Sequence, residues 1–236
     1  MNPTKYNPSF SEFILLIFLI FTSFQCKAVS NLSQTEAIEI EMQKLPLPKR
    51  LAFMSGHVKA GIELYRLNEL KMAGPHLMHP VSETHESERK DLDKLGFNQS
   101  LFVKISHALE KNIKSTEISN MLVEAEKNLD MISQNAGGDP YEIIKFLMAI
   151  ALDEYELSFK DGTIIELGEY QDAWGFVEVS KEHAKRIPNI MKSKELIKEI
   201  SALQKYWKEG PLPVERPTDP LVLKQLIRNI VFLLNH

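Results

Sequence analysis

The chain has a single cysteine, Cys26, among its 236 residues. One cysteine can form neither an internal disulfide nor a zinc site built from cysteine ligands, so both are excluded. The 28 Lys and Arg residues nearly balance the 32 Asp and Glu residues, which leaves a formal net charge of −4. Nucleic-acid binding depends on clustered positive charge, so this near-neutral chain gives no electrostatic reason to expect it.

Signature motifs of common hydrolases are also missing. The sequence contains neither the GxSxG turn of serine hydrolases nor the HExxH helix of metalloproteases, and no cysteine follows residue 30. Each of these motifs supplies a nucleophile or a metal-activated water to the reaction. Hydrolytic activity is therefore not expected, and we predict a protein that is not an enzyme.

Glycine is scarce and no strand pattern is visible. The chain has 10 glycines, with 44% hydrophobic and 25% charged residues, which is the composition of a folded globular protein. No segment alternates apolar and polar residues over the length of a strand. Helix is therefore the expected secondary structure throughout.

The N-terminus carries one long hydrophobic run. Residues 13–24 read FILLIFLIFTSF, which is short for a membrane span of about 20 residues and typical of the core of a signal peptide. The small residues Ala28 and Ser30 follow it. We therefore predict a signal peptide over residues 1–30, cleaved after Ser30 or after Ala28, and export to the periplasm. Lipid attachment at Cys26, or an uncleaved membrane anchor over 13–24, are the alternatives.

Apolar residues recur at the helical period over most of the chain after residue 30. We predict helices over residues 33–44, 49–67, 69–80, 99–113, 116–134, 140–160, 167–186, 190–209 and 219–235. The segment 81–97 is densely charged and is expected to be a solvated helix or loop. The sequence thus predicts an all-α, up-down helical bundle of about seven to nine helices, forming a single domain over residues 31–236.

Capping residues mark several of these boundaries. Asn98, Ser115 and Asp139 precede predicted helices and can accept hydrogen bonds from their first backbone N–H groups. Pro140 suits the first position of the helix that follows Asp139. Gly162 stands where the helix ending at Lys160 should stop, and we expect it to have a positive φ.

Polar side chains fall on the apolar stripes of three predicted helices. His57 shares a stripe with Phe53, and Glu154 follows isoleucines and leucines at spacings of three and four. Glu169 and Asp172 lie one turn apart on a third helix. Burying an unpaired charge costs several kcal/mol, so a carboxylate at such a position must be paired, protonated or bound to a metal.

A second group of candidate ligands lies in the segment GPHLMHP, residues 74–80. His76 and His79 are three residues apart, so both imidazoles face the same way if the segment is helical. A tight connection at Asn68 would bring His57 alongside them. Three imidazoles suit Cu(II), Zn(II) or Fe(II), and added carboxylate oxygens favour iron. The candidate metal ligands are His57, His76, His79, Glu154, Glu169 and Asp172.

Structural explanations compete with each candidate. His57 also fits a core histidine that is hydrogen-bonded to a neighbour, and Glu154 fits a buried ion pair with a Lys or Arg. Glu169 would also be favoured at a helix start by the helix dipole. Nothing in the sequence docks the carboxylates onto the histidines, so one site, two sites, or one site and one ion pair are all compatible with it.

Residues 147–179 carry a resemblance to a known family. Their order is Glu154-Tyr155, Asp161-Gly162, two isoleucines and then Glu169-Tyr170. This resembles the soluble extracytoplasmic helical domain attached to bacterial members of the high-affinity iron permease family. The Arg-Glu-Gly-Leu-Glu motif of that family's membrane-embedded part is absent from the sequence, so the resemblance does not imply transport. It implies a helical extracytoplasmic protein linked to iron or copper.

These observations lead to two functional hypotheses. The first is an exported helical protein that binds a transition metal, iron or copper, without catalysis. The alternative is a metal-free helical module that binds a protein partner in the cell envelope, with Asp161-Gly162 and the two tyrosines as purely structural features. Neither hypothesis includes a nucleic-acid partner or a membrane span in the mature chain.

Overall fold

The computed structural model describes residues 44–81 and 90–236. The predicted signal peptide over residues 1–30, its cleavage after Ser30 and nearly all of the helix predicted over 33–44 lie outside the described residues. Within the described part, no helix is both long and apolar enough to cross a membrane.

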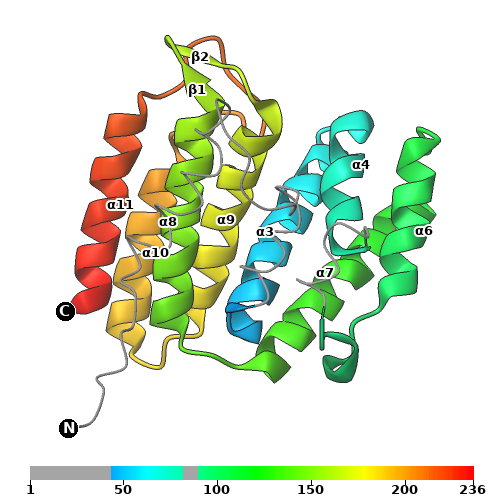
Figure 1. The fold of residues 1–236 in the computed structure, drawn as a ribbon, viewed down its shortest axis with the longest axis horizontal. Coiled ribbons are helices and arrows are strands. Elements are labelled where there is room, and N and C mark those ends of the chain that lie inside the picture. The colour runs from blue at the N-terminus through cyan, green and yellow to red at the C-terminus, as the bar shows by residue number, and fades with distance from the viewer. Residues whose placement is uncertain (1–43, 82–89) are drawn as a thin grey trace, which may run out of the picture.

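Helices make up three quarters of the described residues, which confirms the predicted all-α class. Eight α-helices are described, joined in places by short 3-10 turns (Figure 1). They are α3 (Leu47–Arg66), α4 (Leu70–Met78), α6 (Gln99–Glu110), α7 (Thr116–Ala136), α8 (Pro140–Ser158), α9 (Leu167–Lys185), α10 (Ile190–Gln204) and α11 (Pro220–Asn235). The 3-10 turns are η1 (His79–Val81) and η3 (Asp93–Leu95).

The predicted helix starts are formed by the expected capping groups. The side chains of Asn98 and Ser115 accept hydrogen bonds from backbone N–H groups at the starts of α6 and α7. Asp139 does the same for α8, and Pro140 occupies its first turn. These bonds satisfy N–H groups that the first turn of a helix leaves unpaired. Because donor and acceptor are close in the chain, the helix starts could be predicted from the local sequence.

The expectation of no strand was wrong at one place. The helix predicted to reach Lys160 ends at Ser158, and strands β1 (Phe159–Lys160) and β2 (Thr163–Ile164) form an antiparallel hairpin. Asp161 and Gly162 form its two-residue turn, with φ values of 50° and 81°. Positive φ at both turn positions matches the twist of the strands, and Asp-Gly is a sequence that favours it. The expected positive φ of Gly162 is confirmed.

The charged segment 81–97 was also predicted wrongly in part. Residues 82–89 lie outside the description, but Leu92 and Phe97 are buried in the hydrophobic core on either side of η3. Burial of these apolar side chains holds residues 92–97 against the protein, although Asp93 and Lys94 between them are charged.

The helix predicted over 190–209 ends earlier, at Gln204. After it the chain turns so that Trp207 packs among Tyr155 and Tyr170, and the indole N–H of Trp207 donates to the backbone oxygen of Tyr170 over 3.3 Å. The hydroxyl of Tyr155 donates to the backbone oxygen of Thr218 over 2.7 Å. These rings brace α8, α9 and the connection between α10 and α11.

The buried side chains form two clusters. One fills the bundle of α8, α9, α10 and α11, and the other lies among α3, α4, α6 and α7. In Figure 1, α3 is the helix of the second group that lies next to α9 of the first. Accordingly, Ala52 belongs to the first cluster, whereas Met54 and Val58 belong to the second.

Two glycines allow α3 and α9 to cross closely. A Cβ atom on Gly175 would collide with the backbone oxygen of Gly56, and one on Gly56 would collide with the ring of Phe176. The absence of both side chains therefore brings the backbones into contact. This crossing lies beside His57 and near Asp172, so it sets the distance between these two candidate ligands.

Candidate metal centre

Three helices contribute one ionisable side chain each to a buried cluster. His57 comes from α3, His76 from α4 and Asp172 from α9. One potential ligand atom from each side chain lies within 4.8 Å of the other two, and all three residues are buried. The structure therefore joins part of the predicted histidine group to one predicted carboxylate.

A single oxygen lies between the two imidazoles. Asp172 Oδ1 is 2.7 Å from Nδ1 of His57 and 2.9 Å from Nδ1 of His76. These distances are short enough for hydrogen bonds, yet this buried oxygen has no hydrogen-bond partner of suitable direction. The two nitrogens and the oxygen thus approach one another without N–H groups aimed along the contacts.

Charge explains how the buried carboxylate is tolerated. Burial by itself would raise the pKa of Asp172, but His57 and His76 beside it lower that pKa well below the ordinary value. Burial would likewise lower the pKa of His76, but Asp172, Gln171 and the charge of Glu169 raise it. The neighbouring histidines thus favour the ionised form of Asp172, and Asp172 in turn favours the charged form of His76.

Aromatic rings surround His57. Its imidazole stacks on the ring of His79, with centroids 3.7 Å apart and an angle of 13° between the planes. Phe53 and Phe176 contact it edge-on. The structure thus places His79 beside His57, but its ring is not among the three groups whose ligand atoms converge.

The two remaining predicted ligands pair with each other next to this cluster. Glu154 on α8 and Glu169 on α9 lie close to each other, and this proximity favours the protonated form of Glu154. Burial, together with Glu169 and the charge of Asp172, raises the pKa of Glu154 well above its ordinary value. Glu169 also acts electrostatically on His76. The ion pair with a Lys or Arg that the sequence suggested for Glu154 is therefore replaced by a carboxyl pair.

Two residues of this region escaped the sequence reasoning, namely Gln171 and Met72. Gln171 contacts His76 and Met72, and it is only 2% exposed. Every residue from 170 to 177 is buried, so α9 has no solvent side here. A helix that is buried all round shows no stripe that would mark one polar residue as different from its neighbours.

His183, further along α9, lies away from the cluster. It lines a cavity of 20 Å³, the room of about one water molecule, between α3, α7 and α9. Burial and the charge of Arg186 lower the pKa of His183 to about 4.

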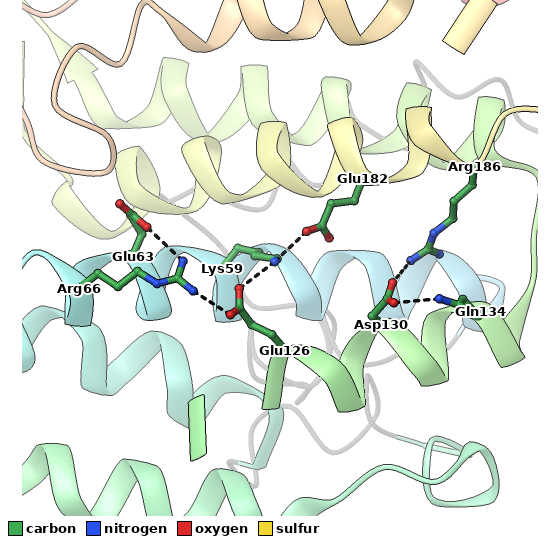
Figure 2. Close-up of polar contacts among 8 residues, drawn as sticks. All are labelled: Lys59, Glu63, Arg66, Glu126, Asp130, Gln134, Glu182 and Arg186. Carbon is green, nitrogen blue, oxygen red and sulfur yellow. Dashed lines mark hydrogen bonds and ion pairs between the residues drawn. The ribbon is translucent and has the colours of Figure 1, made fainter. Parts of the chain in front are cut away.

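A network of ion pairs spans the seam where α3, α7 and α9 meet (Figure 2). Lys59 of α3 bridges Glu126 of α7 and Glu182 of α9 over 3.1 and 2.7 Å. Arg186, directly after α9, pairs with Asp130 of α7 over 2.8 Å. The network ties α7 to the two helices that carry His57 and Asp172.

Comparison with known proteins supports the resemblance found in the sequence. Residues 133–235 match the family model described as the iron permease-associated 4-helix bundle domain. The match covers α8 to α11, so it includes Asp172, Glu154 and Glu169 but neither His57 nor His76. No curated protein and no solved structure matches the chain. The bundle that supplies the carboxylates is thus similar to helical modules associated with iron permeases.

Proposed function

We propose that this protein binds one transition-metal ion, with iron preferred over copper, through His57, His76 and Asp172. The observation that carries the proposal is the approach of two imidazole nitrogens to one oxygen, at 2.7 and 2.9 Å, without hydrogen bonds directed along these lines. Ligand atoms that converge from three helices on a common point favour a cation there, and helical bundles commonly build metal sites from inward-facing His and carboxylate groups.

The donor set favours iron. Two imidazoles and one carboxylate are the ligands of many non-haem Fe(II) sites, whereas copper sites use more nitrogen or sulfur. Glu154 and Glu169 are not among the groups whose ligand atoms converge, but the charge of Glu169 acts on His76 and favours a cation nearby. The match of residues 133–235 to an iron permease-associated domain supports the same choice. We propose binding without catalysis, in an exported protein.

Titration calorimetry with Fe(II) under anaerobic conditions, and with Cu(II) and Zn(II), tests this proposal. We expect the wild type to bind one ion. Asp172→Ala and His76→Ala should each weaken binding strongly, because each removes a side chain that binds the metal directly. His107→Ala is the matched control, since His107 is exposed on α6 and far in sequence from the cluster.

Two results would contradict the metal proposal. One is a wild-type dissociation constant above about 0.1 mM for all three ions. The other is an Asp172→Ala variant that binds like the wild type. Either result would favour the alternative, a metal-free helical module that binds a protein partner in the cell envelope.

A further inference from the structure

Gln171 lies directly outside the cluster of His57, His76 and Asp172 and contacts one of its members, His76. It precedes Asp172 on α9, and its side chain is directed to α4. The amide oxygen of Gln171 lies 2.8 Å from Nε2 of His76, and the amide nitrogen lies 3.4 Å from the sulfur of Met72.

The two neighbours of Gln171 fix the orientation of its amide. A thioether sulfur has no hydrogen to give and can only accept, so the NH2 group of Gln171 must face Met72. The amide oxygen then faces His76. Because an amide oxygen can only accept, Nε2 of His76 must carry a hydrogen and donate it to Gln171.

This hydrogen bond decides which nitrogen of His76 is left for a metal. A metal binds an imidazole nitrogen that has no hydrogen, and the bond made by the other nitrogen sets the tautomer and the ring orientation. In His76 the hydrogen-bonded nitrogen is Nε2, so Nδ1 is the nitrogen left for a metal. Nδ1 already lies 2.9 Å from Asp172 Oδ1. We infer that Gln171, held by Met72, is a positioning residue that presents Nδ1 of His76 to the metal ion.

The inference rests on the proposed metal site, and it distinguishes the two histidines. Nε2 of His57 is buried and has no hydrogen-bond partner among the described residues. His57 therefore lacks the acceptor that Gln171 provides to His76, and its ring is held by packing against aromatic rings instead. Of the two histidines in the cluster, His76 is the preoriented ligand.

Nitrogen-15 NMR of the histidines, combined with Zn(II) titration, tests this role. Zn(II) serves as a diamagnetic probe. In the metal-free wild type we expect a slowly exchanging Nε2–H signal from His76, and after Zn(II) is added we expect coordination through Nδ1 with Nε2–H retained. Gln171→Leu removes the acceptor, so the protected signal should disappear and Zn(II) affinity should fall about 10- to 100-fold.

Three further variants separate positioning from packing. Gln171→Glu keeps an acceptor and should keep the Nε2–H signal. Met72→Leu removes the sulfur that orients the amide, so it should weaken both the signal and Zn(II) binding. Gln204→Leu, a glutamine on α10 that accepts from Lys181, is the matched control and should change neither.

The outcomes separate this inference from the proposed function. A Gln171→Leu variant that folds and keeps the protected Nε2–H signal, or that binds Zn(II) like the wild type, would overturn the role of Gln171. A wild type that shows the protected signal but binds no Zn(II), Fe(II) or Cu(II) would instead overturn the metal site, while the orientation of His76 by Gln171 would stand.

Discussion

Single buried histidines differ in this protein according to what lies beside them. His76 has a carboxylate next to it, which raises its pKa. Burial of His183 and the nearby charge of Arg186 lower the pKa of His183 to about 4. The same side chain is thus favoured as a cation at one place on this fold and as a neutral ring at another.

The stability of the protein should depend on His183 in mildly acidic solution. The unfolded chain takes up this proton near pH 6.5, whereas the folded chain takes it up only near pH 4. The contribution of His183 is therefore complete above about pH 6.5 and decreases as the pH falls toward about 4, by about 3 kcal/mol over the whole range. Urea unfolding of the metal-free protein as a function of pH measures this loss.

The variant His183→Gln should make that acid decrease smaller, and His107→Gln supplies the control because the exposed His107 faces solvent. Equal pH dependence of wild type and His183→Gln would show that the neutral form of His183 contributes nothing to acid sensitivity.

At the scale of helices, the decisive contact is the crossing of α3 over α9. Gly56 and Gly175 face each other there with no side chain between the backbones. The close approach puts His57 within 2.7 Å of Asp172, so the geometry of the cluster depends on two residues that have no ligand atoms.

Gly175→Ala should therefore affect both stability and metal binding. The added methyl group would collide with the backbone oxygen of Gly56, and α3 must move away from α9. Overpacking of this kind costs about 1–3 kcal/mol, which thermal unfolding would detect. Metal affinity should fall as well, because His57 moves away from Asp172.

Gly168 on the same helix provides the comparison. A Cβ atom there meets nothing within 4 Å, so Gly168→Ala should leave both the melting temperature and metal affinity almost unchanged. If Gly175→Ala behaved like Gly168→Ala, the result would contradict a close crossing of α3 and α9 at Gly175.

At the scale of the whole molecule, ion pairs connect the two groups of helices. Lys59 lies between Glu126 and Glu182, and although burial alone would lower the pKa of Lys59, these two carboxylates raise it. The pairs are partly buried, so they are screened less by salt than pairs on the open surface. They join α7 to α3 and α9 across the seam drawn in Figure 2.

Lys59→Met should lower the free energy of unfolding by about 1–2 kcal/mol, because it leaves two carboxylates facing each other without the shared cation. Denaturant unfolding measures the difference, which should shrink at high salt. Lys94→Met removes an exposed i,i+3 pair with Asp91 and should change stability very little. Equal effects of the two substitutions would contradict a stabilising role for the network.

Export is the other expectation at this scale. The hydrophobic run at 13–24 and the small residues that follow it predict cleavage of the N-terminus in a bacterial cell. N-terminal sequencing of the secreted protein should begin at Asn31 or Val29. Recovery of the uncleaved chain in the membrane fraction would instead support the anchor alternative.

Local sequence determined most of the secondary structure of the described residues. Asn98, Ser115 and Asp139 cap their helices through hydrogen bonds to residues two or three positions away, so the necessary partners are adjacent in the chain. The one hairpin was missed although Asp161-Gly162 is a turn sequence, because two-residue strands are too short to show alternation.

The polar residues on apolar stripes were also visible in the sequence, because a helical period of 3.6 residues fixes which side chains share a face. His57 and Asp172 were singled out in this way, whereas His76 was singled out by its spacing of three residues from His79. Their approach to one oxygen was not predictable, since it depends on the docking of three helices that are far apart in the sequence.

The helices, their starts and the choice of candidate ligands thus follow from short-range hydrogen bonds and periodicity, which can be recognised along the chain. Packing between distant helices, by contrast, brings Asp172 to His57 and His76, Glu154 to Glu169, and Gln171 to His76. Which faces meet depends on shape, and here it depends on a glycine in each of two helices that lets their backbones touch.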